Sequence, residues 1–165
     1  MKQAVVYRSA FVAVALTLGA GAASAQGNAA LDGIAKYREM LQDGNPAELF
    51  EMKGEELWKQ KRGPKKASLE QCDLGKGPGV IKGAFVELPR YFKDTNRVED
   101  LEGRIITCME TLQGFNGDEV RKTPFRRGEM ANVTAIATYV ATASKGMKMD
   151  LPQSHPQEKM MYETG

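Results

Sequence analysis

The feature that most constrains this chain is its pair of cysteines, Cys72 and Cys108, which are the only two it contains. Cys72 opens a stretch rich in glycine and proline, residues 72–79, a composition that excludes helix and favours tight turns. Cys108 lies in a segment, residues 97–112, whose apolar residues recur at spacings of three and four, which predicts a helix with the thiol on its apolar face. A bond between the two sulfurs would tie the loop to the core.

The first residues indicate that the chain is exported. Lys2 and Arg8 are followed by an apolar run over residues 9–18 and by small residues ending in Ala23-Ser24-Ala25. This is the three-part pattern of a secretory signal peptide, with cleavage between Ala25 and Gln26. The apolar run is too short to cross a bilayer. We therefore predict a signal peptide over residues 1–25 and no membrane association after its removal.

In an exported chain, an even number of cysteines predicts a disulfide. A Cys72–Cys108 bond would stabilise the fold by about 4 kcal/mol in the chain-entropy model. The alternative is that one of the two thiols is a reactive nucleophile.

The charge of the chain excludes some partners. The signal segment carries two basic residues and no acidic ones, so its removal takes the formal charge from +2 to about zero. No nucleic-acid partner is indicated. Two local basic runs remain, residues 59–66 and the pair Arg126-Arg127. We interpret both as solvated faces; the alternative is a docking patch for an acidic partner.

Periodicity and breakers predict a mostly helical chain with long loops. We expect a helix over residues 31–41 and a second from the Asn45 cap to a point before Gly63-Pro64. The segment 97–112 is predicted as one helix capped by Asn96, and residues 117–128 as a surface loop. A further helix is expected over residues 129–144, then an extended linker and a short helix-compatible terminus. Strand signals are weak throughout.

No motif in the sequence indicates a particular chemical reaction. A c-type haem needs Cys-x-x-Cys-His, which this sequence lacks, and two cysteines with one remote histidine do not make a typical zinc site. We expect His155 to be a solvated linker residue and the glycines of residues 75–79 to be structural. No catalytic, metal-binding or cofactor-binding residue is predicted.

Five segments resemble a known family. Residues 54–64, 72–75, 88–92, 108–115 and 146–149 are similar, in order and spacing, to the amino-terminal half of SoxA, the c-type cytochrome subunit of the periplasmic thiosulfate-oxidising system. Members of that family resemble two tandem cytochrome c domains. The resemblance implies a small, mostly α, cytochrome c-like domain over residues 26–150 that has lost its haem, has long loops and keeps one disulfide, Cys72–Cys108. Residues 151–165 are then expected to form a linker and the start of a second domain.

The resemblance also implies a function. SoxA pairs with the small cytochrome SoxX and couples thiosulfate to a cysteine of the carrier protein SoxYZ, an L-cysteine S-thiosulfotransferase activity with electron transfer through haem. The family's haem c and sulfur-accepting cysteine lie in the second domain, which this sequence does not reach. No catalytic residue is therefore carried over, and whether this chain acts as an enzyme stays open. We expect a periplasmic scaffold half; the alternative is a free-standing, disulfide-stapled binding module without catalysis.

Overall fold

The computed structural model of the protein describes residues 31–39 and 45–164. The chain divides into two units, residues 1–43 and residues 44–165. In the first unit, residues 31–39 form a helix with Leu31 and Ile34 exposed, which confirms the described part of the predicted helix. Leu41 and the predicted cleavage site between Ala25 and Gln26 lie outside the described residues. No helix in residues 31–39 or 45–164 is long and apolar enough to span a membrane.

The second unit is mostly helical, as predicted, with a small two-stranded sheet. Its elements, in chain order, are α2 (Pro46–Lys59), the 3-10 turn η1 (Phe85–Glu87), β1 (Arg90–Phe92), β2 (Arg97–Glu99), α3 (Leu101–Cys108), the π-helical turn η2 (Met109–Gln113), α4 (Gly117–Lys122), α5 (Gly128–Thr142) and α6 (Pro156–Thr164). A long loop joins α2 to η1 and carries Cys72. This arrangement confirms the predicted fold class of a small helical domain with long loops.

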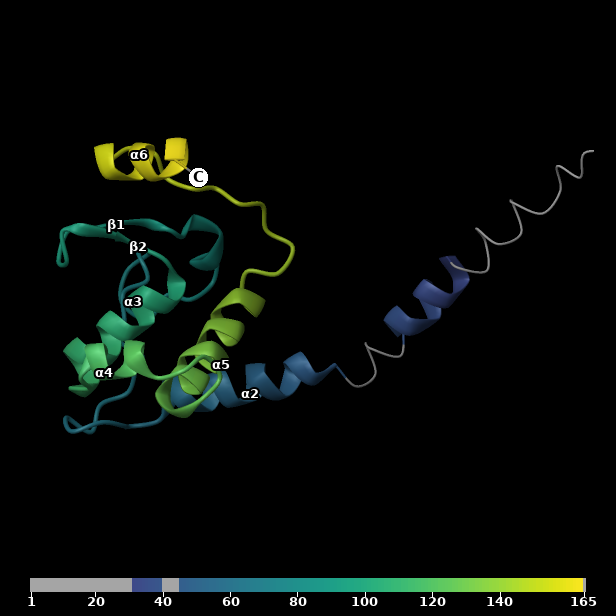
Figure 1. Ribbon diagram of the computed structural model, residues 1–165, viewed down its shortest axis with the longest axis horizontal. Helices are drawn as coiled ribbons and strands as arrows, with labels where there is room; N and C mark the ends of the chain where they lie inside the picture. Colours follow the sequence, from purple (N-terminus) through teal and green to yellow (C-terminus); the bar gives the residue numbers. More distant parts are fainter. Residues whose placement is uncertain (1–30, 40–44, 165) are drawn as a thin grey trace, which may run out of the picture. The chain divides into compact units, whose positions relative to one another are not determined.

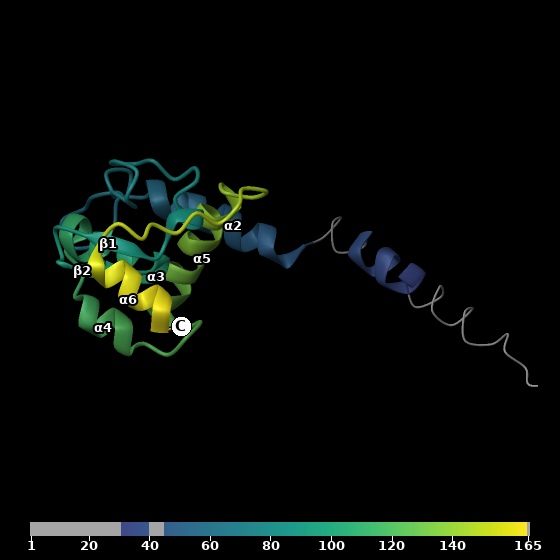
Figure 2. The same cartoon turned by 90° about the horizontal axis from the view of Figure 1, so that it is seen from above.

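Helices α2 and α5 pack across each other, as both views show (Figures 1 and 2). Asn45 caps α2, because its side-chain oxygen accepts a hydrogen bond from the Ala47 N–H at 3.0 Å. At the crossing, Gly54 lies directly against the backbone of Ala135 on α5, and a Cβ atom on Gly54 would overlap the Ala135 carbonyl oxygen. Glycine is therefore what allows the two helices to approach this closely.

The prediction of one helix over residues 97–112 is wrong at its amino-terminal end. Residues 97–99 form β2, which pairs antiparallel with β1 and places Arg90 opposite Glu99. Asn96 does not cap a helix; it has a φ of 54° and forms part of the hairpin turn, a left-handed conformation that asparagine tolerates. The cap is Asp100, whose carboxylate accepts the Gly103 N–H at 2.7 Å. Strands of three residues are too short to give a period-two pattern in the sequence.

The prediction of a plain surface loop over residues 117–128 is also wrong in part. Its first half is α4, capped by Asn116, which accepts hydrogen bonds from the N–H groups of Asp118 and Glu119. Acidic residues in the first turn and basic residues in the last turn suit the helix dipole. The buried side chain of Val120 fixes α4 to the core. The six-residue length of α4 explains why periodicity did not reveal it.

The core lies between α2, α3 and α5 and extends beneath the long loop. Its fully buried side chains include Leu69, Leu74, Ile105, Met109, Val133, Ile136 and Val140. Helix α5 begins one residue before the predicted helix and ends two residues before its predicted end. After an extended segment, α6 packs against the β1–β2 hairpin (Figure 1).

Candidate functional site

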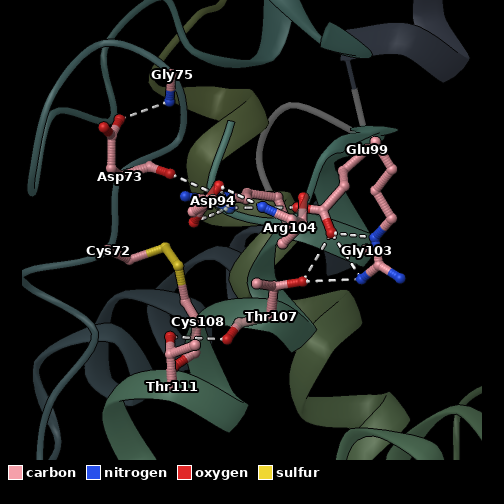
Figure 3. Close-up of polar contacts among 12 residues, drawn as sticks. Cys72, Asp73, Gly75, Asp94, Glu99, Gly103, Arg104, Thr107, Cys108 and Thr111 are labelled. Atoms are coloured by element: carbon pink, nitrogen blue, oxygen red, sulfur yellow. Dashed lines mark hydrogen bonds and ion pairs between the residues drawn. A yellow bond between two sulfur atoms is a disulfide. The ribbon is translucent and has the colours of Figure 1, made fainter. Parts of the chain in front are cut away.

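The two cysteines form a disulfide in the core, which confirms the predicted pairing. The Cys72 and Cys108 sulfurs are 2.05 Å apart, and the Cα atoms are 5.6 Å apart. The two residues are 1% and 3% exposed. The bond joins the long loop to the last residue of α3 (Figure 3). Because both sulfurs are bonded to each other, neither is a thiolate nucleophile, and the alternative of a reactive cysteine does not hold in this state.

The glycine-rich loop after Cys72 is held by a carboxylate. One Asp73 side-chain oxygen accepts the N–H groups of Gly75 at 2.7 Å and Gly77 at 2.9 Å. The Arg90 guanidinium donates to the Gly75 carbonyl at 2.7 Å. Backbone N–H groups that could cradle a phosphate are therefore directed at the protein's own Asp73. This geometry supports the structural interpretation of the loop.

A buried arginine, Arg104, lies beside the disulfide and connects three segments (Figure 3). It is 5% exposed. Its Nε donates to the Asp73 carbonyl at 2.7 Å, and its Nη1 donates to both Asp94 carboxylate oxygens, at 2.8 and 3.0 Å. The same Nη1 lies 3.3 Å from the Glu99 carboxylate. One guanidinium on α3 therefore holds the Cys72 loop, the hairpin turn and strand β2.

Glu99 is the buried carboxylate of this cluster. It accepts hydrogen bonds from the Thr107 hydroxyl and from the Arg97 Nε, each at 2.8 Å. Every charged group here thus has a partner of opposite charge or a hydrogen bond, as buried charges require. The cluster holds the disulfide region in place and leaves none of its carboxylates as a free general base.

Sequence reasoning missed this cluster, although the sequence contained a signal for it. Arg104 comes three residues after Leu101 and four before Cys108, so it lies on the apolar face of α3. A lone arginine on such a face needs acidic partners. Asp94 and Glu99, a few residues upstream, are those partners.

The residues present do not fit a covalently bound haem c. Thioether attachment needs two free cysteine side chains and a neighbouring histidine, and here Cys72 and Cys108 are bonded to each other. The single histidine, His155, lies at the start of α6 with its ring against Tyr91. Met147 and Met149, which could act as soft axial ligands, are about half exposed at the surface. Within residues 31–39 and 45–164, no group of three or more His, Cys, Asp or Glu side chains is placed to hold a metal ion.

The prediction that His155 is a solvated linker residue is wrong. Its ring stacks on Tyr91 of β1, with centroids 3.6 Å apart and planes 8° from parallel. Its Nδ1 accepts the Gln157 N–H at 3.3 Å, so the side chain helps to cap α6. The flanking prolines suggested a free linker, but the contacts of α6 with the hairpin order the segment.

Glu158 joins the start of α6 to the hairpin. One of its carboxylate oxygens accepts the Tyr91 N–H at 2.8 Å, and the other accepts the His155 N–H at 2.9 Å. Burial of the carboxyl raises its pKa, but the hydrogen bonds from His155, Tyr91 and Ser154 lower it by more, and the pKa of Glu158 lies below its ordinary value. The carboxylate is therefore held ionised by its donors.

An apolar groove of about 350 Å³ opens beside Glu158, between α6 and the hairpin. Its lining residues are Pro89, Val98, Leu151, Pro152, Glu158, Met161 and Tyr162. Both Glu158 oxygens already accept backbone hydrogen bonds, so this carboxylate is not a free base in the groove. Its mostly apolar lining is suited to contact with another apolar surface.

Comparison with known proteins identifies the family. Residues 53–149, which run from the middle of α2 past the end of α5, match the SoxA/TsdA cytochrome c domain. The L-cysteine S-thiosulfotransferase subunit SoxA of Hydrogenophilus thermoluteolus is 54% identical over 137 residues, which are 83% of this chain and 50% of that protein. A protein of the same name from Hydrogenobacter thermophilus is 36% identical over 120 residues, which are 73% of this chain and 44% of that protein.

The chain thus spans about half the length of these curated relatives. The family match covers the whole disulfide region, including Cys72, Arg104 and Cys108. The predicted resemblance is confirmed, and the chain belongs to the SoxA/TsdA cytochrome c domain family.

Proposed function

We propose that this chain is part of a SoxA-like subunit of a periplasmic thiosulfate-oxidising cytochrome complex. The observation that carries the proposal is the 54% identity to a protein named L-cysteine S-thiosulfotransferase subunit SoxA. On this proposal, the complex joins thiosulfate oxidatively to a cysteine of a carrier protein.

The role we assign to residues 26–150 is that of a non-haem scaffold domain. The Cys72–Cys108 bond and the Arg104 cluster rigidify the region around the long loop, and neither offers a free reacting group. We assign haem c and the chemistry of sulfur transfer to another part of a SoxA-like protein, reached through residues 151–165.

The partners we propose are a SoxX-like small cytochrome, which forms a heterodimer with the SoxA-like subunit, and a SoxYZ-like carrier protein. Both encounters require export, for which the signal-peptide pattern ending at Ala25 is the support. A buried disulfide also suits an oxidising compartment.

The experiment is co-expression of the full chain with a SoxX-like cytochrome in a bacterium that secretes both. We expect the two to co-purify from the periplasm, and we expect the amino terminus of the chain to be Gln26. We also expect the purified chain alone to lack a Soret band and to contain no titratable thiol. A covalent haem band on this chain would refute the scaffold assignment. Failure to co-purify with the cytochrome would favour a free-standing binding module.

A further inference from the structure

The two basic runs of the sequence have different environments in the structure. In residues 59–66 three of the five cations, Lys59, Arg62 and Lys65, have partners within the protein. The Arg62 guanidinium donates to both Glu129 carboxylate oxygens at 2.7 and 2.8 Å, and the Lys65 ammonium donates to the Thr111 carbonyl at 2.8 Å. Lys59 pairs with Glu55 at 2.6 Å. This run therefore fastens the start of the long loop to the body of the domain.

The second run is directed outward. Residues 121–127, Arg-Lys-Thr-Pro-Phe-Arg-Arg, carry four cations and no acidic residue; we call this segment the basic turn. Within the part of the chain that the structure describes, Arg126 and Arg127 form no ion pair, and Arg121 reaches Glu110 and Asp118 only at 3.5 and 3.6 Å. Because the charge of the mature chain is about zero, the basic turn is a concentrated positive surface on a neutral protein.

An exposed aromatic side chain lies within this charge. Phe125 is 68% exposed, and the Arg126 guanidinium lies 5.5 Å from the centroid of its ring. An aromatic ring covered by an arginine is the residue combination enriched in the energetically important centres of protein interfaces. In this structure Phe125 packs against no core element.

The backbone of the basic turn is ordered rather than extended. The Arg127 N–H donates to the Pro124 carbonyl at 3.0 Å, and Arg126 has a φ of 63°. A non-glycine residue in the left-handed region is energetically unfavourable, and such residues are enriched at functional sites. The backbone that carries Phe125 and the two arginines therefore has a defined turn geometry, which lowers the backbone entropy lost on binding.

We propose that the basic turn is a docking surface for an acidic face of the carrier protein, a proposal that rests on the function proposed above. The surface is small, strongly charged and centred on one aromatic anchor. Such a surface suits a partner that arrives by electrostatic steering and leaves again, as a carrier must. The constitutive cytochrome partner needs a large, apolar interface, which the basic turn does not provide. An anionic membrane is a poorer occupant, because a single phenylalanine buries too little apolar surface to hold the domain there.

The test measures binding kinetics of the full chain with the SoxYZ-like carrier as the probe, at low and high salt. The variants are the double change Arg126→Glu/Arg127→Glu and the single change Phe125→Ala. The matched control is Lys145→Glu/Lys148→Glu, the same charge change at exposed lysines beyond the opposite end of α5. Equal thermal melting of all variants checks that each is folded.

We expect the arginine variant to lower the association rate about tenfold at low salt and to remove most of its salt dependence. Phe125→Ala should mainly raise the dissociation rate, several-fold, and the lysine control should bind as the unaltered chain does. Equal carrier binding by all variants would overturn the docking proposal and leave the proposed function intact. The unaltered chain binding the cytochrome but not the carrier would also overturn it. Binding to neither protein would remove the proposed function as well. Binding to phosphatidylglycerol vesicles that the arginine variant loses, without carrier binding, would replace the carrier with a membrane.

Discussion

The guanidinium of Arg104 lies over the ring of Phe92, 3.9 Å from its centroid. Phe92 ends strand β1, and Arg104 belongs to the helix that carries Cys108. The contact covers one face of a buried cation with an aromatic ring, while Asp94 and Glu99 accept hydrogen bonds from it. The side chain of Arg104 thus joins the hairpin to α3, and its removal should destabilise the packing of both.

We predict that Arg104→Met lowers the free energy of unfolding by about 3–5 kcal/mol, because it leaves the buried Glu99 carboxylate without its Arg104 partner. Adding Glu99→Gln to that variant should recover about 1–2 kcal/mol, since no buried charge is then left. Urea unfolding of the oxidised chain measures both changes. The comparison is Arg97→Met, which removes the other cation that contacts Glu99; because the Arg97 side chain is 53% exposed, this loss should be smaller than that of Arg104→Met. A double variant no more stable than Arg104→Met would contradict the prediction.

A second prediction concerns the disulfide. Cys108→Ser, which leaves Cys72 unpaired, should lower the free energy of unfolding by about 4 kcal/mol, the chain-entropy value for a bond that spans 36 residues. It also places a hydroxyl on the apolar face of α3. Unaltered protein unfolded in the presence of a reductant should show most of the same loss. The same unfolding midpoint with and without the disulfide would refute the prediction.

How far the sequence predicts this structure depends on the length of each element. The long α5 and the capped α2 were predicted because apolar spacing and the Asn45 cap persist over several turns. The β1–β2 hairpin and α4 were missed, since three-residue strands and a six-residue helix are too short for a periodic signal. Their formation depends on tertiary contacts, such as Phe92 under Arg104 and Val120 in the core.

The candidate site also combines features that the sequence predicted with features that it did not. The Cys72–Cys108 pair was predictable from cysteine count and compartment alone. The position of Arg104 on the apolar face of α3 was readable from the sequence, but which acidic residues reach it depends on how the hairpin folds back on α3. The role of His155 depended on the position of α6 beside Tyr91, which no local pattern in the sequence indicates.

A third prediction tests the helix crossing. Gly54→Ala should lower the free energy of unfolding by about 2–3 kcal/mol, because the added methyl group meets the Ala135 backbone, which cannot move as a flexible side chain could. The matched control is Gly33→Ala in the helix over residues 31–39, where an added Cβ has no neighbour within 4 Å. That change should leave the melting temperature of the α2–α5 unit unaltered. Equal melting temperatures of the Gly54 variant and the unaltered chain would show that α2 and α5 can move apart to accept the methyl group.

The last prediction concerns pH and the attachment of α6. The hydrogen bonds that Glu158 accepts from His155, Tyr91 and Ser154 outweigh the opposing effect of burial, so its pKa in the folded chain lies below the ordinary value of 4.5. A carboxyl with a lowered pKa stabilises the fold at pH values above about 4.5, and this stabilisation is lost as the pH falls through the lower, folded-state pKa. Attachment of α6 to β1 should therefore weaken on acidification below pH 4.5.

Hydrogen exchange at the Tyr91 amide, which donates to Glu158, reports this attachment directly. We expect protection of this amide to fall as the pH is lowered through that range, after correction for the intrinsic pH dependence of exchange. In Glu158→Gln, protection should be lower at neutral pH and should no longer change with acidification, because the neutral amide is a weaker acceptor than the carboxylate and does not titrate. The Leu69 N–H, which donates to the Trp58 carbonyl near the end of α2, serves as the internal reference. A Tyr91 amide whose protection follows that reference at every pH would mean that the Glu158 carboxylate does not hold α6 on the hairpin.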